Sequence, residues 1–130
     1  MRVLLDTHVA IWAVTERRRI PKALLAIISD TTNDVIVSVV AVWETAIKHR
    51  LARPDSPPFS GHDAIGHFED AGFALLSVIP PHAAFVERLP PIHSDPFDRL
   101  MVAQAVVENV HLVTHDDLLR RYDVAVLGWT

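Results

Sequence analysis

The stretch RVLLDTHVAIWAV, residues 2–14, joins a short apolar run to a pattern of apolar residues at helical spacing. The run over residues 3–5 has no polar alternation, which is typical of a strand buried on both faces. The segment after Asp6 predicts a helix over residues 8–14. A buried strand followed directly by a helix is the unit from which parallel α/β sheets are built.

The same alternation continues along the chain. Short runs rich in valine, isoleucine and leucine predict further strands at residues 34–40, 73–79, 111–114 and 124–127. Helical patterns fall between them, at residues 22–29, 38–51, 62–71, 81–89 and 95–109, with Ser38 and Asn109 as expected caps. We therefore expect one domain over residues 1–130, an α/β fold with a mostly parallel sheet.

The composition narrows the class of protein. Half of the 130 residues are hydrophobic and 22% are charged, so the chain can bury a core and disorder is not expected. No cysteine is present, which excludes disulfides and thiol chemistry. The apolar run before Asp6 is too short for a signal-peptide core, and no run reaches membrane-spanning length. We expect a cytoplasmic protein with no membrane partner.

The net charge of −4 is not that of a general nucleic-acid binder. Basic residues are nevertheless clustered at residues 17–22, 48–53 and 120–121. Such clusters are either solvated helix ends or local contacts to phosphate.

HSDPFDRLMVAQA, residues 93–105, carries two carboxylates three residues apart. Asp95 precedes Pro96, and a proline at the first helical position makes Asp95 a good N-cap. Asp98 then lies in the first turn, where the helix dipole favours an acid. Local structure accounts for both residues and leaves a second role for Asp98 open.

Two more acids follow predicted strands. Asp6 ends the first strand, while Asp116 and Asp117 follow the strand at residues 111–114. Each can cap a helix, but ligands of parallel α/β proteins gather at the carboxyl ends of the strands.

Glu44 lies inside the helix expected at residues 38–51, near the edge of a face shared by Val40, Trp43 and Ile47. It either points to solvent beside Lys48 or lies against packed residues, where a glutamate needs a partner or a metal ion.

Three of these aspartates and Glu44 can meet at one rim of the sheet. Clustered carboxylates repel one another and require neutralisation. Oxygen-only ligands suit Mg²⁺ or Mn²⁺, which activate water and stabilise a leaving oxygen in nucleases. A bound cation would also reconcile an acidic chain with a nucleic-acid substrate.

The sequence resembles the PIN-domain ribonucleases, specifically the VapC-type toxins of toxin–antitoxin pairs. The resemblance rests on VLLDTHVAIW, VSVVAVWETAIKHRL, DPFDRLMVAQA and LVTHD, and it covers the whole chain. It implies a three-layer α/β/α sandwich, RNA as substrate, Mg²⁺ or Mn²⁺ as cofactor, a cognate antitoxin and a homodimer. It assigns catalysis and metal binding to Asp6, Glu44, Asp98 and Asp116.

The resemblance also implies supporting roles. Thr7 and Thr114 match small polar residues of the family, and Asp117 competes with Asp116 for the fourth acid position. Asp95 is the expected cap and could reach the metal ion through water. Arg99 is expected to pair with a carboxylate or to meet phosphate.

Other interpretations remain open. A binding module whose acids only cap helices would have no metal site, and a phosphatase of the haloacid dehalogenase type would want an aspartate where His8 stands. A response-regulator receiver would need a lysine after a late strand. None of the eight histidines forms a zinc motif. His8, His93 and His115 lie near acids in sequence, and we expect Trp12, Trp43 and Phe97 in the core or a dimer contact.

Overall fold

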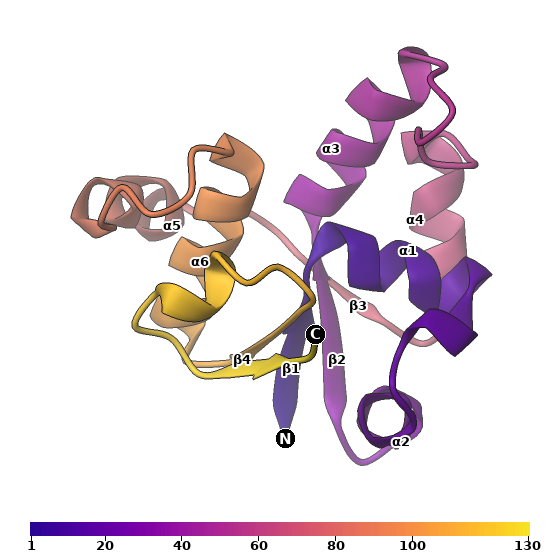
Figure 1. Ribbon diagram of the computed structural model, residues 1–130, viewed down its shortest axis with the longest axis horizontal. Helices are drawn as coiled ribbons and strands as arrows, with labels where there is room; N and C mark the ends of the chain where they lie inside the picture. The colour runs from indigo at the N-terminus through magenta and orange to yellow at the C-terminus, as the bar shows by residue number, and fades with distance from the viewer.

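The computed structural model describes residues 1–130 as a five-stranded parallel sheet with helices on both faces (Figure 1). The strands lie in the order β3-β2-β1-β4-β5, and every pair is parallel. The strands are β1 (Arg2–Leu5), β2 (Asp34–Ser38), β3 (Ala74–Leu76), β4 (His111–Thr114) and β5 (Val126–Gly128). The α-helices are α1 (Thr7–Thr15), α2 (Lys22–Ser29), α3 (Val39–Arg50), α4 (Gly61–Asp70), α5 (Pro80–Phe85) and α6 (Pro96–Glu108).

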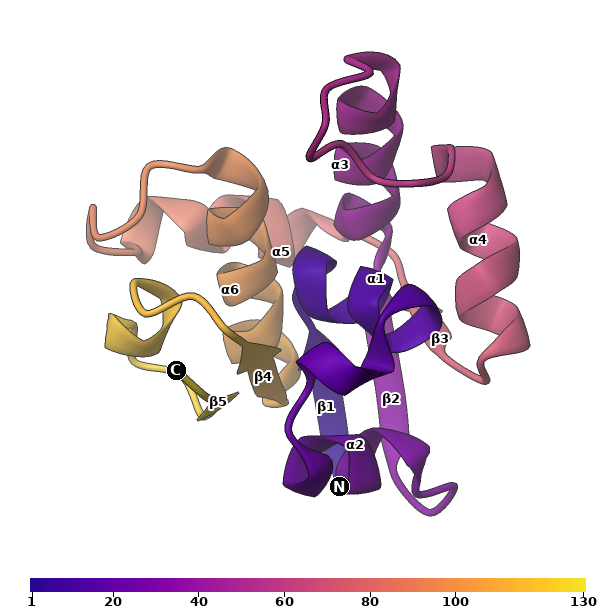
Figure 2. The ribbon, with the colours of Figure 1, turned by 45° about the vertical axis from the view of Figure 1, so that its right-hand side comes forward.

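Two hydrophobic clusters fill the spaces between the central sheet and the helices on its two faces. Along β1, Val3 and Leu5 belong to one cluster and Leu4 to the other, because successive side chains point to opposite faces of a sheet. The first cluster packs the sheet against α1, α2 and α4, and the second packs it against α6. Figure 2 shows α5 and α6 on one side of the sheet and α1, α2 and α4 on the other. The expected three-layer sandwich is confirmed.

The expected caps are also present. β2 stops at Ser38, earlier than its apolar run suggests, because the Ser38 hydroxyl accepts a hydrogen bond from Val40 N and starts α3. Asp95 caps α6, with Pro96 at its first position. Asn109 ends that helix in the left-handed region, with φ of 54°.

The sequence predicts a packed face of α3 formed by Val40, Trp43 and Ile47, but only Val40 is buried. Trp43 is 56% exposed and Ile47 41% exposed, although Val40 on the same helix is buried. Trp43 lies edge-on against Phe97 with ring centroids 4.8 Å apart, so this pair sits at the surface and not in the core. In Figures 1 and 2, α3 extends beyond the sheet, which leaves these side chains without a covering layer.

The register of the sheet brings the carboxyl ends of β1 and β4 together. Leu5 lies opposite Val113, and Asp6 N continues the ladder with a 3.0 Å hydrogen bond to the Val113 carbonyl. Asp6 and Thr114, 108 residues apart in sequence, therefore become neighbours. No helix combines the length and the apolar character needed to cross a membrane.

Candidate metal centre

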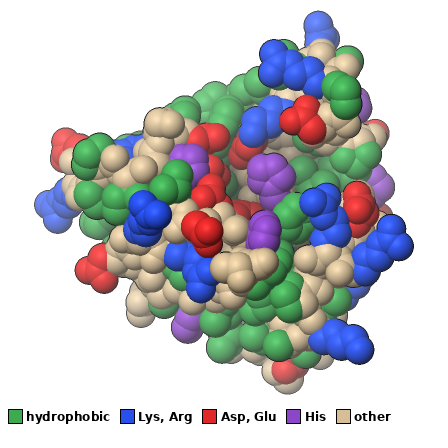
Figure 3. All heavy atoms as spheres, viewed as in Figure 1, with side chains coloured by type: hydrophobic (Ala, Val, Ile, Leu, Met, Phe, Trp, Pro, Cys, Tyr) green, Lys and Arg blue, Asp and Glu red, His purple; other side chains and the backbone are tan.

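A cavity of about 730 Å³ lies where β1 and β4 end. Figure 3 shows acidic and histidine side chains around a hollow near the middle of this face. All four acids predicted from the sequence line the cavity, namely Asp6, Glu44, Asp98 and Asp116. They come from four different elements, so only the fold brings them together.

Asp6 caps a helix and faces the cavity at once. Its Oδ1 accepts a 2.9 Å hydrogen bond from Val9 N at the start of α1, and its Oδ2 accepts one from the Thr114 hydroxyl. Thr114 Oγ1 in turn accepts a 3.0 Å hydrogen bond from Asp116 N. Burial raises the pKa of Asp6 above its ordinary value, more than these hydrogen bonds lower it.

Glu44 is buried and paired. It is 2% exposed, and Thr7 Oγ1 donates a 2.7 Å hydrogen bond to its Oε1 while the Lys48 ammonium pairs with its Oε2. The interpretation in which Glu44 points to solvent is wrong, although the pair with Lys48 does form. Partial burial lowers the pKa of Lys48, but the hydrogen bond and charge of Glu44 raise it further, so the net shift is upward. Lys48 therefore remains a cation beside the acids.

The two carboxylates of the 93–105 segment separate into different positions. Asp95 Oδ1 accepts hydrogen bonds from Phe97 N at 2.8 Å and Asp98 N at 3.3 Å, which is a helix cap. The Asp98 carboxylate reaches into the cavity, 3.2 Å from His93 Nε2. Burial, followed by the charges of Asp95, Glu44 and Asp6, raises the pKa of Asp98 to about 7.

The adjacent acids after β4 also differ. Asp116 Oδ2 lies 2.9 Å from His93 Nε2, and its Oδ1 accepts a 2.9 Å hydrogen bond from Leu118 N. The Asp117 side chain is 71% exposed, pairs with Arg120 at 3.5 Å and lies outside the cavity. The geometry thus favours Asp116 as the fourth acid.

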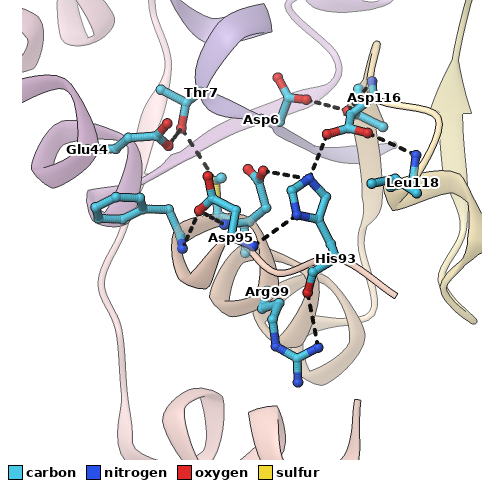
Figure 4. Close-up of polar contacts among 12 residues, drawn as sticks. Asp6, Thr7, Glu44, His93, Asp95, Arg99, Asp116 and Leu118 are labelled. Carbon is cyan, nitrogen blue, oxygen red and sulfur yellow. Dashed lines mark hydrogen bonds and ion pairs between the residues drawn. The ribbon is translucent and has the colours of Figure 1, made fainter. Parts of the chain in front are cut away.

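His93 links two of these acids, a contact that the sequence did not specify (Figure 4). One atom each of His93, Asp98 and Asp116 lies within 4.8 Å of the others, a spacing compatible with a metal ion. However, Asp95 N donates to His93 Nδ1 at 3.0 Å, so in the neutral ring the proton resides on Nε2. His93 is then a hydrogen-bond donor to both carboxylates, not a ligand. The sequence offers one signal for this role of His93, which is its position two residues before Asp95, the N-cap of α6.

Arg99 points away from the acids (Figure 4). Its guanidinium donates to the Pro90 carbonyl at 3.0 Å and to the Tyr122 hydroxyl at 3.2 Å, with longer contacts to other carbonyls of residues 86–93. It makes no ion pair, so the expected pairing with a carboxylate is absent. Tyr122 also accepts a 2.8 Å hydrogen bond from His93 N, and Arg99 thus holds the loop that positions His93.

The donor set fits a hard divalent cation. Four carboxylates surround one cavity. Besides the contacts of His93, the only ion pair that any of them makes is the one between Glu44 and Lys48. Mg²⁺ and Mn²⁺ prefer such oxygen ligands, and no cysteine is present to favour a softer metal. Asp6, Glu44, Asp98 and Asp116 are the side chains that would hold the ion.

Residues 3–125 match the PIN domain family. No curated protein matches this sequence. Among solved structures, Rickettsia felis VapBC2 bound to a DNA fragment from its promoter gives a TM-score of 0.75 at 14% identity, covering 100% of both chains.

Two further neighbours have the same fold. DNA-bound VapBC from Salmonella typhimurium gives a TM-score of 0.71 at 14% identity, covering 100% of this chain and 99% of the other. VapBC-1 from nontypeable Haemophilus influenzae gives 0.67 at 16% identity, covering 99% and 98%.

Proposed function

Because this chain belongs to the PIN domain family, we propose that it is a Mg²⁺- or Mn²⁺-dependent endoribonuclease and the toxin of a VapBC-type toxin–antitoxin pair. The observation that carries the proposal is the convergence of Asp6, Glu44, Asp98 and Asp116 on one cavity, from four separate elements. A protein whose acids only capped helices would have no reason to bury Glu44, which lies in the middle of α3 and caps nothing.

The chain's own residues prepare this cavity for a cation and a phosphodiester. A bound divalent cation would supply an activated water and stabilise the leaving oxygen. Thr114 and Thr7 hold Asp6 and Glu44 through their hydroxyls. His93 donates to Asp98 and Asp116, which restrains two carboxylates that would otherwise repel each other.

We predict that Asp98→Asn lowers RNA cleavage by several orders of magnitude. The amide keeps the shape of the side chain but removes the charge that a cation needs, and Asp95 still caps α6. Cleavage of total RNA in millimolar Mn²⁺, and in chelator, measures the effect. Asp117→Asn is the matched control, because Asp117 is exposed outside the cavity.

Equal cleavage by both variants would refute the assignment of Asp98 as a ligand. Wild-type cleavage that is indifferent to chelator would refute the metal-dependent mechanism. Hydrolysis of a small phosphomonoester in place of RNA would favour the phosphatase alternative.

The proposed partner is a cognate antitoxin, with a homodimer as the proposed assembly. The solved neighbours named above are VapBC complexes, which supports an antitoxin. On α3, Trp43 and Ile47 leave an exposed apolar face that continues to the C-cap Leu51, and a partner could cover it. Co-expression with the protein encoded by the adjacent gene should yield a copurifying complex and relieve growth arrest. A chain that is harmless when expressed alone would contradict the toxin role.

A further inference from the structure

Aromatic rings form part of the wall of the same cavity. His8 and Trp12 lie one turn apart on α1, with ring centroids 6.0 Å apart. His115, after β4, lies 6.0 Å from Trp12, and Trp129, after β5, lies 6.1 Å from it. We call these four residues the aromatic wall. Three separate segments contribute to it, so the fold assembles the wall as it assembles the acids.

Trp12 is the centre of the wall. It contacts all three other rings, and the guanidinium carbon of Arg19 lies 4.3 Å from its ring centroid. His115 and Trp129 are held together by centroids 4.9 Å apart and by a 3.1 Å contact from His115 Nδ1 to the Trp129 carbonyl. The wall is therefore a fixed surface of π systems with one cation stacked on it.

Three of the four wall residues share one cavity with the acids, and Trp129 packs against Trp12 and His115 without lining it. His8, Trp12, Arg19 and His115 line it together with Asp6, Asp98 and Asp116. The chain itself joins the two groups, because His8 is two residues after Asp6 and His115 immediately precedes Asp116. A molecule whose reacting phosphate reaches the acids has the wall within the same cavity.

Core packing alone does not account for the wall. Trp12 and Trp129 pack partly against the main hydrophobic cluster, as a boundary tryptophan does. However, His8, Arg19 and His115 are exposed and contribute nothing to that core. Exposed rings and a guanidinium stacked at the rim of a polar cavity are the groups on which nucleobases stack.

We propose that the aromatic wall and Arg19 form a subsite for one unpaired nucleobase of the RNA, adjacent to the phosphodiester bond that is cleaved. This inference rests on the proposed ribonuclease function. It adds a requirement that the four acids do not impose: the substrate must offer an unstacked base, because a base inside a duplex has both faces covered. Arg19 contributes its flat guanidinium to the stack and its charge to the neighbouring phosphate.

Binding of RNA without cleavage tests the subsite. All proteins carry Asp98→Asn, and the probe is a short fluorescein-labelled single-stranded RNA containing all four bases, followed by anisotropy in millimolar Mg²⁺. Trp12→Ala should weaken binding on the order of five- to a hundredfold, the range for loss of one base–aromatic stack. Phe85→Ala is the control, since Phe85 also has an arginine near its ring, with the Arg88 guanidinium carbon 6.0 Å from the centroid, but lies outside the cavity.

A second variant guards against damage to the fold. Trp12 touches the hydrophobic core, whereas Arg19 is exposed, so Arg19→Lys keeps the charge, removes the planar group and leaves the core intact. A series of probes with one abasic nucleotide at successive positions then locates the stacked base. The protein with an intact wall should lose affinity at one position, and the Trp12→Ala protein should lose none there.

The outcomes separate this inference from the function on which it rests. One outcome is that the wild type cleaves RNA with metal, while Trp12→Ala and Arg19→Lys bind every probe as tightly as their parent does. The wall would then serve packing only, and the proposed nuclease function would be supported. If the wild type cleaves nothing, the nuclease fails. Abasic sensitivity that depends on Trp12 would then still support an RNA-binding wall. Equal binding of duplex and single-stranded probes would overturn the requirement for an unpaired base.

Discussion

At the scale of single residues, His93 determines how two acids approach each other. Its Nε2 lies 3.2 Å from Asp98 Oδ2 and 2.9 Å from Asp116 Oδ2, and Asp95 N fixes its other ring nitrogen as an acceptor. A hydrogen-bond donor between two carboxylates orients both of them. Loss of a residue that holds a ligand in this way typically costs roughly ten- to a hundredfold in metal affinity.

We predict that His93→Ala weakens Mn²⁺ binding by roughly ten- to a hundredfold, because Asp98 and Asp116 lose their shared donor. The measurement is the Mn²⁺ concentration that gives half of the maximal rise in melting temperature. His62→Ala is the matched control, since His62 is exposed on α4 and makes no hydrogen bond through its side chain. Tighter Mn²⁺ binding by His93→Ala would mean that His93 competes with the cation.

The sequence predicts the four acids that line the cavity and Lys48 beside Glu44, but not the contacts of His93 and Arg99. Asp6, Asp98 and Asp116 were identifiable because each follows a strand or a cap, where chain direction fixes the position. The burial of Glu44 was undecidable locally, since Lys48 is available to it whether the pair faces solvent or the cavity. The roles of His93 and Arg99 depend on the path of the loop that precedes α6, and a hydrophobic pattern does not predict the path of a loop.

At the scale of elements, α5 is held on α6 by a buried histidine. His82 is 0% exposed, its Nδ1 accepts a 3.1 Å hydrogen bond from Ile79 N, and its Nε2 lies 2.9 Å from Glu108 Oε2. Gln104, also on α6, contacts the same ring at 3.3 Å. His82 is the only buried residue of this six-residue helix, so the helix depends on such a network for its position.

We predict that His82→Leu lowers the free energy of unfolding by about 1–3 kcal/mol, the cost of leaving buried polar groups unpaired. Urea unfolding followed by circular dichroism measures this loss, with His62→Ala as the control. Cleavage measured well below the melting temperature should be unchanged, because His82 lies outside the cavity. A variant as stable as the wild type would show that the network contributes nothing net.

The elements were predictable where two signals agreed. α6 was bounded correctly because Asp95, Pro96 and Asn109 mark both ends of one apolar pattern. The apolar runs predict the ends of two strands too late: β2 stops at Ser38 and β3 at Leu76, although apolar residues continue to residues 40 and 79. An apolar run does not by itself extend a strand, since Val78 and Ile79 are 37% and 43% exposed. β3 ends at Leu76, which pairs with Ser38, the last residue of β2, so the limit is set by the neighbouring strand.

At the scale of the whole molecule, the acids that serve the proposed reaction work against folding. The pKa of Asp98 in the folded protein is raised to about 7 from its ordinary value of 3.8. Between these values the folded chain holds a proton that the unfolded chain has released, so stability falls as pH rises through this window. Above it, the full cost of an ionised and buried Asp98 is present. Binding of a cation reverses the balance, because it requires the ionised form.

We predict opposite pH trends for wild-type protein with and without metal. From about pH 5 to about pH 8, the melting temperature in chelator should fall relative to that of Asp98→Asn, which lacks the ionising group. Titrating groups remote from Asp98 are shared by both proteins and cancel in the difference. In millimolar Mn²⁺, the gain in melting temperature over chelator should grow with pH in the wild type and stay small in Asp98→Asn. Parallel pH curves for the two proteins in chelator would show that Asp98 is ionised without penalty, and the cavity would then be open to solvent rather than shaped to hold a cation.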